Sequence, residues 1–210
     1  MKNLLIFNIV LFFCSFEANT QILTDNQIKK HIIDKISTVQ SLQCDFVQTK
    51  KQKLLANPVI SKGKMYYQNA NKLRWEYITP YSSVFIFNAN KALSKNDNDT
   101  KVIDIQKNKV FKGISEIMLN TISGNFLANE NDFKISFKQS SEMFFATLLP
   151  QNKEMKKMFQ NIILHFERKT AVVSKVEIIE TNGDKTIIDF KNIKRNEEIP
   201  NKIFDINALK

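Results

Sequence analysis

The chain has 210 residues, a formal net charge of +10 and a hydrophobic content of 43%. Its length suits one domain, and its positive charge favours an anionic partner such as a membrane surface, an acidic protein or nucleic acid. The lysines are scattered and do not alternate with aromatic residues. This pattern and the export signal described next argue against nucleic acid and make a solubilising surface the simplest interpretation of the charge.

Residues 1–20 are typical of a secretory signal peptide. A short basic start is followed by an apolar run at residues 4–13 and then by small and polar residues up to Thr20. The apolar run has about half of the roughly 20 residues that a membrane-spanning helix needs. We predict removal of residues 1–20 and a single exported domain at residues 21–210. Lipid attachment at Cys14 is a weaker alternative, because phenylalanines precede it where small residues are required.

After the signal, residues 24–39 predict an amphipathic helix. Thr24 or Asp25 is suited to cap its start. Its apolar side chains recur at helical spacing, at Ile28, Ile32, Ile36 and Val39. His31 lies beside this stripe and is expected to face solvent.

From residue 42 the periodicity changes to two, which predicts strands. Turn-like residues and Pro80 separate the predicted strands 41–49, 59–68, 72–79, 81–89, 91–97 and 100–106. Within the first of them, Cys44 alternates with Leu42 and Phe46. It is the one cysteine outside the signal, so we expect a small buried apolar side chain and no internal disulfide bond.

Residues 107–123 break the strand pattern and predict an interrupted amphipathic helix or two short ones. Gly124 is placed to end this segment, and Gly113 weakens its middle. Its apolar stripe consists of Val110, Ile114, Ile117, Met118 and Ile122.

Strand patterns resume after residue 130. The predicted strands are 131–139, 142–150, 160–168, 171–180, 185–194 and a short one at 202–206. Asn182 and Gly183 favour a hairpin with a type I′ turn. Long antiparallel strands, with helices only at the start and in the middle, predict a mainly β (α+β) fold. We expect one curved sheet or unclosed antiparallel β-barrel with no internal repeat.

The sequence carries no recognisable catalytic or metal-binding motif. His31 and His165 lie in different predicted elements, and neither HExxH nor GxSxG is present. The acidic stretch at 96–99 lacks the glycine and the final glutamate of a calcium loop. We therefore expect neither an enzyme nor a metal-binding protein.

Large apolar side chains are the feature that the sequence has in excess. Leu73, Trp75 and Tyr77 share one face of a predicted strand, because side chains alternate along it. Residues 83–88 are apolar on both faces, which a sheet with one solvated face should not be. Either helices cover one of these faces, or one face lines a cavity. A plain two-layer core is the simplest alternative.

From residue 26 to residue 207, the order of these elements and several of their residues resemble the LolA family of outer-membrane lipoprotein carriers. The anchors are Phe46, Gln48, Gly63, Trp75, Pro80, Asn196 and Phe204. The last two fall as in the family's final two strands. The resemblance implies an unclosed antiparallel barrel, with a helical lid over an apolar cavity.

The resemblance also implies a set of site residues. The cavity wall is expected to include Phe46, Leu73, Trp75, Tyr77, Phe85, Phe87 and Phe145. The lid is expected at Val110, Ile114, Ile117, Met118 and Ile122. Asn69 stands where well-known members carry an arginine that latches the lid, and Ala70 replaces the usual proline.

The implied function is that of a monomeric periplasmic carrier, which shields the acyl chains of lipid-modified proteins. Such carriers accept cargo from an ABC transporter of the inner membrane and pass it to an acceptor at the outer membrane. No cofactor, metal or nucleic acid is expected. A carrier of another lipid or hydrophobic molecule, or a sensor on the same fold, stays open as an alternative.

Overall fold

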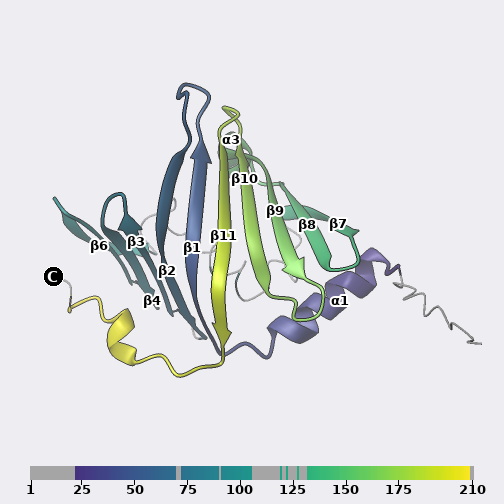
Figure 1. The fold of residues 1–210 in the computed structure, drawn as a ribbon, viewed down its shortest axis with the longest axis horizontal. Coiled ribbons are helices and arrows are strands. Elements are labelled where there is room, and N and C mark those ends of the chain that lie inside the picture. Colours follow the sequence, from purple (N-terminus) through teal and green to yellow (C-terminus); the bar gives the residue numbers. More distant parts are fainter. Residues whose placement is uncertain are drawn as a thin grey trace, which may run out of the picture.

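The computed structural model describes residues 22–69, 72–89, 91–105, 119, 122, 127 and 132–208. The expected signal peptide and most of the expected helix at 107–123 lie outside the described residues. The described residues form one antiparallel sheet of 11 strands, in the order β6-β5-β4-β3-β2-β1-β11-β10-β9-β8-β7 (Figure 1). Within these residues, no helix combines the length and the apolar character that crossing a membrane requires.

The strands coincide with the period-two segments of the sequence to within two residues at either end. Their bounds are β1 (Ser41–Lys51), β2 (Val59–Gln68), β3 (Lys72–Thr79), β4 (Ser83–Asn88), β5 (Lys91–Asn96), β6 (Thr100–Asp104), β7 (Phe133–Gln139), β8 (Met143–Pro150), β9 (Phe159–Glu167), β10 (Val173–Glu180) and β11 (Lys185–Arg195). The helical elements are α1 (Asp25–Ile36), α3 (Lys153–Met158) and the 3-10 helix η3 (Asn201–Phe204). The predicted mainly β fold with an unclosed antiparallel sheet is confirmed.

Helix α1 covers one face of the sheet, which we call the inner face. Its start is closed by a capping box between Thr24 and Gln27. Its buried stripe of Ile28, Ile32 and Ile36 joins the main apolar core. Figure 1 shows α1 along the half of the sheet that contains β7 to β10.

The expectation that His31 faces solvent is wrong. His31 is half-buried, and its Nε2 lies 2.9 Å from the main-chain oxygen of Arg168. Its ring also meets the Phe144 ring edge-on, with 5.6 Å between the ring centroids. Helical spacing places His31 next to the buried stripe. Its burial was not predictable from that spacing, because both of its partners come from the distant part of the chain that forms the sheet.

The C-terminal segment covers part of the opposite, outer face. Residues 197–206, here called the C-terminal strap, follow β11, and their helix η3 contacts β3 and β4. Figure 1 shows the strap in yellow at the lower left, near the lower ends of these strands. A second apolar core forms there, consisting of Val84, Ile86, Leu93, Ile199, Phe204 and Ile206. Arg74 Nη1 donates to the main-chain oxygen of Ile203 at 3.3 Å, and Asn88 Nδ2 donates to that of Phe204 at 3.2 Å. Strand β4 is therefore apolar on both faces because the strap buries its outer face.

Two local predictions are wrong. The strand expected at 202–206 is absent, and residues 201–204 form η3 instead. The hairpin between β10 and β11 exists, but its turn is not type I′. Gly183 N donates to Glu180 O at 2.9 Å, and within this turn only Gly183 has a positive φ, of 86°. A type I′ turn needs positive φ at both central residues, whereas a three-residue loop with glycine at its end needs it once.

Candidate functional site

An apolar cavity of about 440 Å³ lies on the inner face of the sheet. One side of its wall comes from the end of α1 and the first strands: Ile36, Val39, Leu42, Cys44, Gln48, Met65, Trp75, Tyr77, Phe85 and Phe87. The other side comes from Ile122 and the last strands: Phe159, Ile162, Ala171, Val172, Val173, Val176, Ile178, Ile188, Phe190 and Ile193. The volume falls within the range of about 300–1,000 Å³ that is usual for ligand pockets.

The aromatic part of the wall is held in place by ring contacts. The Phe46 ring stacks on Trp75 with 4.3 Å between centroids and meets Tyr77 edge-on at 5.3 Å. Phe190, from the other half of the sheet, meets Trp75 edge-on at 6.1 Å. These geometries are favourable for aromatic pairs. Phe46 thus supports Trp75 from behind and fixes the face that Trp75 presents to the cavity.

Gly63 makes this stacking possible. It lies directly across from Phe46 in the pairing of β1 with β2. A Cβ atom at position 63 would lie 2.5 Å from Cζ of Phe46 and would also clash with the main-chain oxygen of Glu76. Because glycine has no side chain, the Phe46 ring is able to lie across β2 and reach Trp75.

Polar groups on the wall are few. Among the described residues of the wall, Gln48 is the one with an amide side chain, and none carries a charge. Tyr77 donates its hydroxyl to Gln48 Oε1 at 2.9 Å, so these two oxygen atoms are paired within the protein. Burial raises the pKa of the Tyr77 hydroxyl, so this hydroxyl stays protonated at neutral pH.

Cys44 contributes an inert apolar surface to the wall. Its side chain is buried and forms no disulfide bond, as the sequence predicts. Burial, with a smaller effect of the neighbouring Asp45 charge, raises the pKa of the thiol to about 12. A thiol needs to lose its proton to act as a nucleophile, so Cys44 offers no chemistry at neutral pH.

The structure places the predicted site residues in three different environments. Trp75, Tyr77, Phe85, Phe87 and Ile122 lie on the cavity wall. Phe46 and Leu73 point to the same face and are buried, but they are not among the residues that line the cavity. Their role in binding lipid stays a prediction.

Phe145 is also misplaced by the sequence. In β8 the buried inner-face side chains are Phe144, Ala146 and Leu148. Phe145 alternates with them and therefore lies on the outer face, where its ring meets the His165 ring edge-on at 5.0 Å between centroids. When two phenylalanines are adjacent in a strand, the sequence does not show which of them faces the core, since either side chain fits the apolar face.

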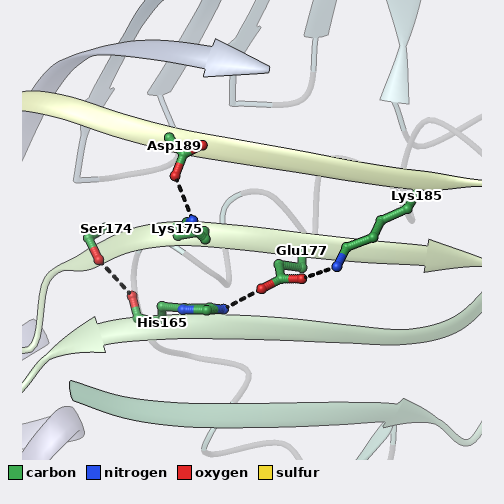
Figure 2. A network of polar contacts seen from close by, with 6 residues as sticks. All are labelled: His165, Ser174, Lys175, Glu177, Lys185 and Asp189. Atoms are coloured by element: carbon green, nitrogen blue, oxygen red, sulfur yellow. Dashed lines mark hydrogen bonds and ion pairs between the residues drawn. The ribbon is translucent and has the colours of Figure 1, made fainter. Parts of the chain in front are cut away.

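A network of ion pairs occupies the outer face around His165 (Figure 2). His165 Nε2 lies 2.8 Å from Glu177 Oε1, and Lys185 Nζ lies 2.5 Å from Glu177 Oε2. The hydrogen bond from Lys185 is the largest cause of a lowered pKa of Glu177. Lys175 pairs with Asp189 beside them at 3.0 Å. The network links β9, β10 and β11 on the side of the sheet away from the cavity.

The described residues do not provide a metal centre. They contain no group of three or more His, Cys, Asp or Glu side chains that could hold an ion. The cavity offers shape and apolar surface, which suits the binding of an apolar ligand.

The amino-acid sequence matches the family model of the outer membrane lipoprotein carrier protein LolA over residues 37–207. The chain belongs to the LolA family. The outer-membrane lipoprotein carrier protein of Legionella pneumophila is 26% identical to it over 178 residues, covering 84% of this chain and 83% of the relative. That of Nitrosospira multiformis is 22% identical over 198 residues, covering 94% of this chain and 91% of the relative.

Solved structures agree with this fold. An uncharacterized conserved protein from Thermus thermophilus gives a TM-score of 0.51 at 10% identity, covering 85% of this chain and 91% of that chain. The MucA/MucB complex of Pseudomonas aeruginosa also gives 0.51 at 10% identity, covering 86% of this chain and 60% of that chain. At such identities the likeness concerns the fold alone. LolA-family carrier proteins are binding proteins without enzymatic activity.

Sequence reasoning missed the half of the cavity wall that comes from β9 to β11. Ile162, Val176, Ile178, Ile188 and Phe190 line it, and each belongs to a predicted strand. The period-two pattern already places Val176 and Ile178 on one face. Alternation therefore gives their shared face, but it does not show that this face borders open space.

The predicted latch and lid are only partly described. Asn69 lies in the turn after β2, where its Nδ2 donates to Gln40 Oε1 at 3.1 Å. Of the lid residues, Ile122 lies on the wall. Val110, Ile114, Ile117 and Met118 lie outside the described residues. The latch role of Asn69 in this LolA-family chain stays a prediction.

Proposed function

We propose that this chain is a periplasmic carrier that shields the acyl chains of lipid-modified proteins in its cavity. It accepts them from an ABC transporter of the inner membrane and releases them to an acceptor at the outer membrane. Membership of the LolA family and the names of the relatives support this role. The observation that carries it is the cavity of about 440 Å³, whose described wall contains no charged side chain.

The energy of exposing an acyl chain explains why a carrier is needed. Each buried CH₂ group contributes about 0.8 kcal/mol, so a chain of about 15 methylenes costs on the order of 12 kcal/mol to expose to water. The carrier has to offset most of this cost but must not bind more favourably than a membrane, or it would retain its cargo. An aromatic wall that surrounds open space meets both requirements, because its voids lack the close contacts of a packed core.

The proposed lid completes this account. Ile122, at the end of the apolar stripe that starts at Val110, lies on the cavity wall. An apolar stripe that packs into the empty cavity stabilises it, and a cargo acyl chain displaces that stripe on entry. Cargo binding and lid movement are then coupled, because contacts between the cavity and the stripe are replaced by contacts between the cavity and the acyl chain.

Two neighbouring isoleucines of β10 provide a matched test. Ile178 lies on the cavity wall, whereas Ile179 pairs with Lys185 and points to the outer face. The chain has a single tryptophan, Trp75, which lies on the wall and reports occupancy by energy transfer to a dansyl-labelled fatty acid. We expect Ile178→Glu to abolish transfer and Ile179→Glu to preserve it.

Mass spectrometry of molecules that co-purify with the protein identifies the cargo. Lipopeptides would support a lipoprotein carrier, and a single class of free lipid would support a carrier of another lipid. Wild-type protein that shows no energy transfer from Trp75 would contradict any acyl carrier. Equal loss of transfer in the variants of Ile178 and Ile179 would contradict this cavity as the site.

A further inference from the structure

Several of the exposed large apolar side chains of the described residues lie at one end of the sheet. The hairpin that joins β1 to β2 contributes Leu54, 97% exposed, and Leu55, 51% exposed. Ile78 and Tyr81, at the turn after β3, are 51% and 79% exposed at the same end. Figure 1 shows this hairpin extending beyond the neighbouring strands at the top of the view. We call residues 50–62 the β1–β2 tip.

The tip is held in a defined conformation. Leu55 N donates to Gln52 O at 3.0 Å, which closes a turn that projects Leu54 outward. Lys53 N donates to Asp184 Oδ1 at 3.0 Å and so ties the tip to the turn between β10 and β11. The two exposed leucines thus lie on an ordered turn. Their exposure to water does not stabilise the monomer.

The side chains of the tip itself carry only positive charge, while Asp184 and Glu180 of the neighbouring hairpin contact it. The tip contains Lys50, Lys51, Lys53 and Lys62 and no acidic residue. Lys50 Nζ lies 3.3 Å from Glu180 Oε1. The side chains of Lys51, Lys53 and Lys62 are exposed and form no ion pair with the described residues. Apolar side chains surrounded by lysines are the pattern by which proteins bind an anionic membrane surface, since the apolar groups enter the lipid and the cations meet the headgroups. Two copies meeting through this tip would bring like charges together, which disfavours a dimer.

The cavity reaches towards the same end. Phe159 and Ile178 belong to its wall, and Phe159 directly follows Met158, which is 42% exposed. Met158 O accepts from Thr181 N at 3.2 Å, which joins α3 to the turn that holds the tip. A surface that binds this end of the sheet therefore comes close to the cavity wall.

We propose that the β1–β2 tip docks on a phospholipid bilayer that contains anionic headgroups. Leu54 and Leu55 enter the bilayer below the headgroups, while Lys51, Lys53 and Lys62 lie at headgroup level. The carrier then approaches the membrane with a fixed orientation, and the docking itself requires no protein receptor. The evidence for docking does not depend on the proposed function. Only the biological purpose of docking rests on it.

Vesicle co-sedimentation of the purified protein tests the proposal. We expect binding to vesicles of phosphatidylglycerol and phosphatidylethanolamine to exceed binding to vesicles of phosphatidylcholine by about tenfold or more, since each lysine near an anionic surface contributes roughly fivefold. The double variant Leu54→Gln/Leu55→Gln should weaken binding by about tenfold or more. The variant Lys51→Gln/Lys62→Gln should remove most of the preference for anionic vesicles. Val102→Gln, at a 45% exposed valine of β6, is the matched control and should bind as the wild type does.

Energy transfer from Trp75 to the dansyl-labelled fatty acid, measured on the same proteins, separates this proposal from the proposed function. The tip variants should keep normal transfer, which also shows that they are folded. Wild-type protein that does not sediment with anionic vesicles, or a leucine variant that sediments equally well, overturns docking even where transfer is normal. Elution of the wild type as a dimer that the leucine variant converts to a monomer would also overturn it. Vesicle binding without energy transfer would support docking and contradict the proposed cavity function.

Discussion

Truncation of Leu73 and of Ile178 should separate the packed core from the cavity wall. Leu73 is completely buried, so Leu73→Ala leaves a cavity among close-packed neighbours and should lower the free energy of unfolding by about 2–5 kcal/mol. Ile178 faces existing open space, so Ile178→Ala loses fewer contacts and should cost less than about 2 kcal/mol. For a domain of this size, each 1 kcal/mol corresponds to roughly 2–4 °C in Tm.

Binding of the dansyl-labelled fatty acid should show the opposite order. Ile178→Ala alters the surface that meets the ligand and should change its Kd, whereas Leu73→Ala should leave Kd close to the wild-type value at a temperature where the variant is folded. Thermal unfolding followed by circular dichroism and titration followed by Trp75 fluorescence provide the two measurements. If Leu73→Ala changes Kd without lowering Tm, then Leu73 lies on the wall and the description of the core is wrong.

Two further predictions follow from packing and charge. Gly63→Ala should destabilise the protein by about 1–3 kcal/mol and weaken binding of the fatty-acid probe, because the added Cβ displaces the Phe46 ring that supports Trp75; unchanged Tm and Kd would contradict the stacking argument. Glu177 has a lowered pKa in the folded protein, so its contribution to stability is complete above its unfolded-state pKa of about 4.3 and is lost as the pH falls through the folded-state value. Glu177→Gln should therefore lower stability at pH 7 by about 1 kcal/mol or less and reduce the loss of stability on acidification. Urea unfolding at pH 7 and near pH 4 measures both, and a variant whose stability falls as steeply with acid as the wild type would contradict the assignment.

The sequence alone predicts the strands well because most of them bury one face. Alternation in 59–68 and 72–79 matches β2 and β3 residue for residue. Periodicity fails where two apolar residues are adjacent, as with Phe144 and Phe145, because either parity gives an apolar inner face. It also fails for the C-terminal strap, where Ile203 and Phe204 are short-range neighbours in a 3-10 helix whose partner surface is far away in the sequence.

The cavity wall could be predicted only in part, for a related reason. Trp75, Tyr77, Phe85 and Phe87 lie on the face that alternation gives them, and this face borders the cavity. Whether a side chain on that face borders open space depends on the curvature of the sheet and on its neighbours' sizes. Leu73 and Trp75 share a strand face, yet Leu73 is completely buried and is not among the residues that line the cavity.

The single break in the strand order has a consequence for folding. Every neighbouring pair in the sheet is consecutive in the chain except β1 and β11, whose pairing joins the two halves. Each half is able to form through local hairpins, whereas the central ladder brings together residues such as Gln43 and Lys194. Ladders with large sequence separation form slowly, because loop closure has to precede any favourable contact. The cavity wall draws on both halves, so the apolar pocket comes into existence only when the last strand has reached the first.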